Sequence, residues 1–118
     1  MSNHISVGKQ GEQKAVEFLE NNQYTILHLN YRIGKDEADI ICTKDNYLIF
    51  VEVKTRSTDY FQKPYEAVTK AKQQNLIRLA NNYVERENTH LEIRFDVVSV
   101  IKRNNHYDIQ HIKDAFQP

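Results

Sequence analysis

The chain has 118 residues, which is enough for one domain with a hydrophobic core and too few for two comfortable ones. Apolar residues make up 40% and charged residues 27%, so the composition excludes a disordered or fibrous protein. Sixteen basic residues balance sixteen acidic ones, and the net charge therefore gives no general attraction to nucleic acid or to an anionic membrane. We expect residues 1–118 to form a single domain that holds any charged partner locally.

The sequence carries no signal for export or membrane insertion. Cys42 has no second cysteine in the chain to pair with, and the segment MSNHISVGKQGE lacks the apolar core of a signal peptide. No apolar run approaches the roughly 20 residues that a spanning helix needs. We therefore expect a cytoplasmic protein with no membrane role.

The periodicity of apolar residues predicts two helices and five strands. The first helix is expected over about residues 7–22, with Ala15, Val16 and Leu19 on one stripe, and the second over about residues 65–87. Segments with alternating or β-branched residues between polar turns predict the strands: residues 24–32, 36–43, 47–55, 91–101 and 106–112. The order αβββαββ predicts an α/β (α+β) fold, with a mixed central sheet of about five strands flanked by helices on one side or on both.

Two carboxylates meet in the hairpin formed by the second and third predicted strands. A turn at residues 45–46 makes the numbers of opposed residues sum to 91, so Asp39 faces Glu52 and Glu37 faces Lys54. Like charges in such a pair are destabilising, and the more so at the end of an apolar surface. A divalent cation would remove this repulsion, and an all-oxygen pair suits Mg²⁺ or Mn²⁺ better than Zn²⁺.

A structural interpretation of the same residues remains open. The hairpin could present a solvated charged face, with Glu37 and Lys54 as a simple ion pair, and an odd loop length would slip the register. The acids would then bind no metal.

Each predicted helix places one charged residue on its apolar stripe. Glu12 shares the stripe of Ala15 and Leu19, although an acid in a first helical turn is also favoured by the helix dipole. Lys72 shares a stripe with Leu76, although a lysine stem often lies along apolar surface with its ammonium in water. Both are candidate site residues.

The acids and the lysine together resemble a known nuclease site. Glu12, Asp39 and the run Glu52-Val53-Lys54 resemble the D…(D/E)xK site of the restriction-endonuclease-like (PD-(D/E)xK) superfamily, and the leading helical Glu is similar to that of archaeal Holliday junction resolvases. Nearly the whole chain resembles the YraN family of small bacterial proteins, whose functions are largely unassigned. The segments that carry this resemblance are GKQGEQKAVEFL, NYRIGKDEADII, FVEVKTR, AVTKAKQQNLIRLANNYV, RFDVVSV and HIKDAF, with FVEVKTR the most specific.

The sequence departs from the family pattern at one place. Residues 36–39 read Asp-Glu-Ala-Asp where the family usually has Gly-Glu-Ile-Asp, so the metal-binding acid is kept. The extra acid, Asp36, is expected to weaken the approach of a phosphate.

The resemblance implies a metal-dependent endonuclease that hydrolyses phosphodiester bonds. Asp39, Glu52 and the backbone carbonyl of Val53 would hold one or two Mg²⁺ or Mn²⁺ ions, with Glu12 binding directly or through water. Lys54 would orient the attacking water or offset the charge that develops on the phosphate. The expected substrate is DNA, with branched DNA as one candidate, and a homodimer is left open.

The basic residues near the predicted site are expected to bind phosphates. Residues 54–78 contain six basic residues against two acidic ones, so the basic charge is regional in an otherwise neutral chain. Tyr60, Phe61 and Tyr65 could stack on bases, although aromatic residues beside a proline more often anchor a loop. The predicted phosphate contacts are Arg56, Lys63, Lys70 and Lys72.

Two other functions fit the sequence. The chain could be a binding module for nucleic acid or protein that keeps the nuclease fold without cleavage, or a structural adaptor whose acids form a solvated face. The five histidines have no spacing suited to zinc, and Cys42 is expected to be a small buried thiol. Asp96 is expected to pair with Arg94.

Overall fold

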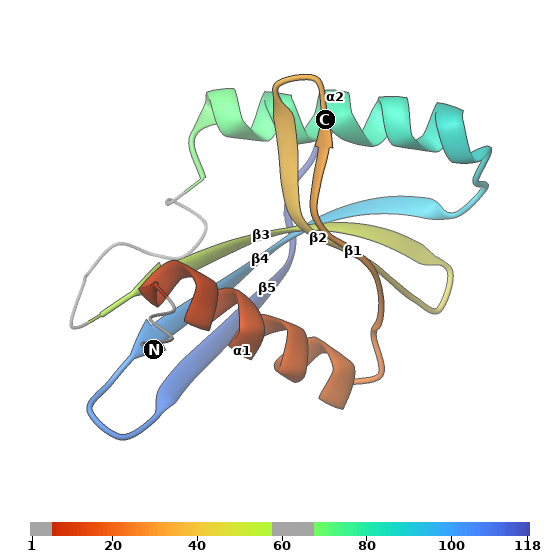
Figure 1. Cartoon of the computed structure of the whole chain (residues 1–118). Coiled ribbons are helices and arrows are strands. Elements are labelled where there is room, and N and C mark those ends of the chain that lie inside the picture. The colour runs from red at the N-terminus through yellow and green to blue at the C-terminus, as the bar shows by residue number, and fades with distance from the viewer. Residues whose placement is uncertain (1–5, 58–67) are drawn as a thin grey trace, which may run out of the picture.

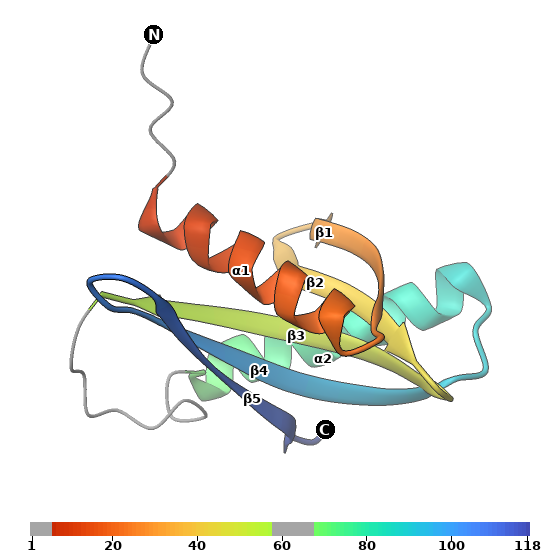
Figure 2. The same ribbon diagram turned by 90° about the horizontal axis from the view of Figure 1, so that it is seen from below.

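The computed structural model describes residues 6–57 and 68–118, which form a five-stranded mixed sheet with one helix on each face (Figures 1 and 2). The predicted order αβββαββ and the α+β fold class are confirmed, and the helices take opposite faces. The elements are α1 (Val7–Asn21), β1 (Thr25–Ile33), β2 (Asp36–Lys44), β3 (Tyr47–Arg56), α2 (Lys70–Glu87), β4 (Glu92–Lys102) and β5 (Tyr107–Phe116).

The strands lie in the sheet in the order in which they occur in the chain. Every neighbouring pair is antiparallel except β3 and β4, which run parallel from Tyr47–Glu92 to Arg56–Ile101. A parallel pair needs a crossover connection, and α2 lies in the connection between these two strands. The carboxyl ends of β3 and β4 therefore lie side by side at the same end of the sheet.

The β2–β3 hairpin has the register that the sequence predicts. Asp45 adopts a positive φ of 55° in the turn, and the paired residues run from Lys44–Tyr47 to Ile40–Val51, so their numbers sum to 91. The expected opposition of Asp39 and Glu52 lies one step past the last of these pairs. There the Asp39 carboxylate accepts a hydrogen bond from the backbone N–H of Val53, at 2.8 Å from N to Oδ2.

Side-chain alternation along β2 and β3 divides the apolar residues between the two helices. Ile40 and Val51 pack on the α1 face with Ala15 and Leu19. On the opposite face, the α2 residues Leu76, Leu79, Ala80 and Tyr83 pack against β2, β3 and β4, chiefly against Ile41, Leu48, Phe50 and Phe95. Glu52 lies two residues after Phe50 on β3, so its side chain also points to the α2 face.

Most element boundaries differ from those predicted by one residue, and those of α2 and β5 differ by more. The predicted start of α2 near residue 65 falls outside the described residues, and the described helix begins at Lys70, because the Thr69 hydroxyl caps it by accepting from the backbone N–H of Lys72 at 3.2 Å. Strand β5 continues to Phe116 rather than ending at residue 112, because Phe95 of β4 pairs with Phe116 and their rings stack at 5.1 Å. Strand β1 spans Thr25–Ile33, one residue later than expected.

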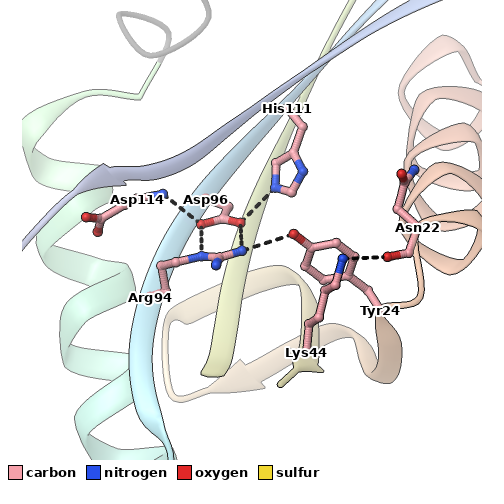
Figure 3. Close-up of polar contacts among 7 residues, drawn as sticks. All are labelled: Asn22, Tyr24, Lys44, Arg94, Asp96, His111 and Asp114. Atoms are coloured by element: carbon pink, nitrogen blue, oxygen red, sulfur yellow. Dashed lines mark hydrogen bonds and ion pairs between the residues drawn. The ribbon is translucent and has the colours of Figure 1, made fainter. Parts of the chain in front are cut away.

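A buried polar network ties β4 and β5 to Tyr24, the residue before β1 (Figure 3). Asp96 is fully buried and accepts two hydrogen bonds from Arg94, both at 2.9 Å, and one from the backbone N–H of Asp114, also at 2.9 Å. His111 Nε2 lies 2.7 Å from Asp96 Oδ2, and Arg94 also donates to the Tyr24 hydroxyl at 3.2 Å. Although burial opposes it, these partners lower the pKa of Asp96. The expected pairing of Asp96 with Arg94 is confirmed.

Helix α1 crosses β3 in close contact at Gly11. A Cβ at this position would lie 1.8 Å from Thr55 Oγ1 and 2.8 Å from Thr55 Cβ, so only a glycine allows the approach. At Gly8 the nearest atom to an added Cβ is Ser6 Oγ, at 4.0 Å. The absence of a side chain at Gly11 therefore sets the distance between α1 and the sheet.

We predict that Gly11→Ala lowers the free energy of unfolding by about 1–3 kcal/mol, because the methyl group overpacks the α1–β3 contact. Gly8→Ala is the matched control and should be neutral or stabilising, since alanine is the better helix former and has room. Urea unfolding followed by circular dichroism measures both. Equal effects of the two substitutions would contradict the close contact.

We predict that Asp96→Asn lowers the free energy of unfolding by about 3–5 kcal/mol, because Arg94 loses its buried counter-charge. Asp108→Asn is the control, since Asp108 is exposed and pairs with Arg103 at the surface, and it should change stability little. Urea titration at pH 7 compares the two. A small effect at Asp96 would mean that the network is not needed for stability.

Candidate metal and nucleic-acid site

Glu52 is a buried acid on the α2 face of the sheet. Its side chain is only 2% exposed. Oε2 lies 3.0 Å from Lys72 Nζ and 3.8 Å from Lys54 Nζ, whereas Oε1 is buried without a hydrogen-bond partner in the described part of the chain. Buried polar atoms are nearly always paired, so an unpaired carboxylate oxygen indicates a position that something else can fill.

Burial and the neighbouring charge of Asp39 raise the pKa of Glu52 to about 7, although Lys72 and Lys54 act in the opposite direction. Burial also raises the pKa of Asp39, against the hydrogen bond from the Val53 N–H. The charge of Asp39 thus opposes the ionisation of Glu52, whereas a hydrogen bond with the Glu52 carboxyl acts to lower the pKa of Asp39. A proton or a cation shared between them would relieve this repulsion.

Glu12 approaches Asp39 from α1. Its side chain is 25% exposed, and burial and the charge of Asp39 raise its pKa. It therefore lies on the inward stripe, as predicted. The first turn of α1 contains no acid, so the dipole of the helix start, the alternative explanation, does not account for Glu12.

Sequence reasoning missed Asn30, a β1 residue beside these acids. Asn30 lies between the β1 residues that pair with Ile40 and Ala38, which places it next to Asp39. Its side chain interacts with the Glu12 carboxylate and acts to lower the pKa of that acid. It has a positive φ of 51°, a conformation that asparagine tolerates better than most residues. An asparagine within an alternating strand was the signal that could have indicated it.

The donor atoms at this place are all oxygen. Asp39 and Glu52 supply carboxylates and Val53 a backbone carbonyl, a set that suits Mg²⁺ or Mn²⁺. Within residues 6–57 and 68–118, no three His, Cys, Asp or Glu side chains are grouped closely enough to hold a metal ion. The side chains as they lie thus bring two carboxylates together, with Glu12 interacting at longer range.

The ion pair of Lys54 with Glu37, which the structural interpretation offered as an alternative, is not the one that forms. Lys54 makes its ion pair with Glu52, at 3.8 Å, and Glu37 pairs with Arg32, at 3.4 Å. The physical reason is that Lys54 and Glu52 are two residues apart on one strand and share a face, beside a buried carboxylate that attracts a cation strongly. Lys54 therefore faces the candidate site itself.

The expected effect of Asp36 on phosphate is also not supported. Asp36 is 3% exposed, and Arg78 of α2 donates to both of its oxygens, at 2.8 and 2.7 Å. These hydrogen bonds lower the pKa of Asp36. Its charge is neutralised within the fold, where it ties β2 to α2.

The predicted phosphate contacts are only partly described. Lys72 lies at Glu52, Lys70 is the first residue of α2, and Arg56 ends β3 beside Ile101 of β4. Lys102 follows Ile101 and extends this basic edge, which the sequence alone did not indicate. The following predicted residues lie outside the described residues: Tyr60, Phe61, Lys63 and Tyr65.

The other residues considered have structural positions. Cys42 is fully buried, and burial raises the pKa of its thiol to about 12, so it is no nucleophile. Of the histidines, His28 contacts Tyr83 and His111 contacts Asp96. In the parts of the chain that the structure describes, neither helix is long and apolar enough to cross a membrane.

Fold and site together define a small α+β protein in which the acids Asp39 and Glu52 and the lysines Lys54 and Lys72 lie around the carboxyl half of β3. The model of the Uncharacterised protein family UPF0102 matches residues 11–100. The chain belongs to this family, which is the YraN family that the sequence resembles, so that prediction is confirmed.

Relatives carrying the same family name match along nearly their whole length. A UPF0102 protein of Christiangramia forsetii is 46% identical over 116 residues, which cover 98% of each chain. One from Bacteroides thetaiotaomicron is 43% identical over 118 residues, covering 100% of this chain and 98% of the relative. Another, from Caldicellulosiruptor saccharolyticus, is 45% identical over 117 residues, covering 97% and 99%. The family description assigns no activity.

We predict that metal-free stability falls by about 2 kcal/mol between pH 5 and pH 8 through Glu52 alone. Its pKa rises from the usual 4.5 to about 7 on folding, so the folded state holds a proton that the unfolded chain has released. Glu52→Gln should remove this part of the pH dependence and raise stability at pH 8. Urea unfolding in EDTA at several pH values measures it.

Glu17→Gln is the control, since Glu17 is an exposed acid on α1 and the substitution is the same. It should leave the slope of stability against pH unchanged. A Glu52→Gln variant whose slope matches that of the wild type would contradict the raised pKa.

Proposed function

We propose that the protein is a metal-dependent nuclease that binds and hydrolyses DNA at the Asp39–Glu52 pair. One observation carries this proposal: the Glu52 carboxylate is 2% exposed, lies beside a second acid, and has an oxygen without a partner in the described part of the chain. A buried acid that the fold leaves incompletely satisfied is typical of a cation or catalytic site.

The donor set fits Mg²⁺ or Mn²⁺. Asp39, Glu52 and the Val53 carbonyl would hold one or two ions, with Glu12 acting through water or after a side-chain movement. Such an ion polarises a scissile phosphate and lowers the pKa of a bound water. A bound cation would offset the burial that raises both pKa values and the Asp39 charge that adds to the rise at Glu52, which supplies a driving force.

The protein's own residues have separate tasks in this proposal. The Val53 N–H donates to Asp39 Oδ2, so the Asp39 carboxylate is oriented before any ligand arrives. Lys54, on the same face as Glu52, would hold the attacking water or stabilise negative charge that develops on the phosphate. Glu12 would add negative charge near Asp39, and Asn30 would favour the ionised form of Glu12.

Nucleic acid would be bound by the cations around the acids. Lys54, Lys72, Lys70 and Arg56 all belong to the carboxyl end of β3 or the amino end of α2. The resemblance of the acid set to archaeal resolvases makes branched DNA one candidate substrate and a homodimer one candidate assembly. Binding through phosphate contacts should weaken steeply as salt rises.

A second function is favoured by a separate observation. Lys72 already neutralises Glu52, and the described acids do not form a three-ligand cluster. Both features suit a module that binds nucleic acid or a protein partner without cutting it. The two functions differ in the expected effect of Asp39→Asn: a nuclease should lose cleavage, whereas a binding module should keep its affinity.

We predict that the purified protein cleaves labelled DNA only with Mg²⁺ or Mn²⁺, and that Asp39→Asn lowers the rate by at least about 100-fold. A panel of single-stranded, duplex, flap and four-way-junction DNA identifies the preferred substrate. Asp108→Asn, an exposed acid changed in the same way, controls for contaminating nuclease and should retain full activity. DNA binding without cleavage by any of the three proteins would favour the binding module.

A further inference from the structure

We propose that Lys72 is a resident counter-cation of Glu52, displaced when a divalent ion binds, and that the freed ammonium then contacts a nucleic-acid phosphate. Metal binding and nucleic-acid binding would thereby be coupled through one side chain. This inference rests on the proposed metal site, and it assigns Lys72 a positioning role rather than a catalytic one.

The geometry distinguishes the two lysines at Glu52. Lys72 Nζ is 3.0 Å from Oε2, within hydrogen-bonding distance, whereas Lys54 Nζ is 3.8 Å away. Lys72 therefore occupies the position from which a cation would bind this oxygen. The other oxygen, Oε1, has no partner among the described residues. The Lys72 ammonium thus provides a close partner for one oxygen of Glu52 and leaves the other without one among the described residues.

A divalent ion bound to Glu52 would repel the Lys72 ammonium if the lysine stayed at its present position. A divalent ion on Oε2 would lie within a few ångströms of the ammonium in a poorly solvated site, where like charges repel strongly. Asp39 and Glu52 carry two negative charges at most, and although Glu12 and Glu37 add to the local charge, an ion and Lys72 compete for the same Glu52 oxygen. One cation has to leave.

Lys72 is the lysine that can leave without disturbing the core. Its side chain is 46% exposed, against 31% for Lys54, and it lies in the first turn of α2 rather than inside the sheet. Rotation about its side-chain bonds moves the ammonium into solvent while Thr69 still caps the helix. There it lies at a helix start, where backbone N–H groups favour an anion such as phosphate.

Coupling follows in both directions. While Lys72 holds Glu52, it competes with metal and is itself withheld from phosphate. Metal binding releases it, so nucleic acid binds more tightly with metal, and by linkage metal binds more tightly with nucleic acid.

The first measurement is Mn²⁺ binding by isothermal titration calorimetry, using the full chain without DNA. Lys72→Met keeps the apolar stem and removes the competing charge, so it should bind Mn²⁺ about 10-fold more tightly than wild type. Lys70→Met is the matched comparison, two residues earlier on the same helix and with the same change of charge. It should alter Mn²⁺ affinity by less than about 2-fold.

The second measurement is the affinity for labelled duplex DNA by fluorescence anisotropy, in EDTA and in Ca²⁺, an oxygen-binding ion chosen to test binding without turnover. Wild type should gain at least about 5-fold in affinity from metal. Lys72→Met should show a clearly smaller gain. Lys70→Met should bind more weakly in both conditions and keep the wild-type ratio.

The outcomes separate this inference from the proposed function. If wild type binds no Mn²⁺, both fail. If wild type binds Mn²⁺ while Lys72→Met has unchanged Mn²⁺ affinity and an unchanged DNA ratio, the metal site stands and the exchange is wrong. Lys72→Met should melt at a lower temperature in EDTA, because Glu52 loses its partner; if it does not fold, Lys72→Gln, which retains a hydrogen-bond donor, replaces it in both measurements.

Discussion

The parallel pairing of β3 with β4 is the constraint on which the site depends. After β3 ends at Arg56, the chain must return to the level at which β3 began before it can enter β4 in the same direction. Helix α2 makes this return, with its amino end near the carboxyl end of β3 (Figure 1). The first turn of α2 contains Lys70 and Lys72. The crossover therefore carries two cations to the place where β3 presents Glu52.

The local elements of this fold could be predicted because each depends on neighbouring residues. The polar pair at residues 45–46 closes the β2–β3 hairpin, and from it the whole register follows. Choices between distant partners could not be predicted. The faces taken by the helices, the extension of β5 to Phe116 and the left-handed conformation of Asn30 all depend on tertiary packing, which a single sequence does not display.

The candidate site shows the same division. The types of residue and their spacing indicated that Asp39 and Glu52 come close, and the structure bears this out through the Val53 hydrogen bond and the electrostatic interaction of the two carboxylates. The ion pair of Asp36 was not predictable, because its partner Arg78 comes from α2, far along the chain. Lys54, in contrast, pairs with Glu52, two residues earlier on the same strand and on the same face.

Two buried acids in one sheet show why Glu52 is unlike a structural residue. Asp96 is fully buried, yet Arg94, His111 and a backbone N–H contact both of its oxygens, and its pKa is lowered (Figure 3). Glu52 is almost as buried, has one oxygen without a partner among the described residues, and has its pKa raised to about 7. The same chain thus satisfies one buried carboxylate completely and leaves the other incomplete. Stability alone would favour the first arrangement at both positions, so the difference at Glu52 is best explained by a ligand that the fold itself does not supply.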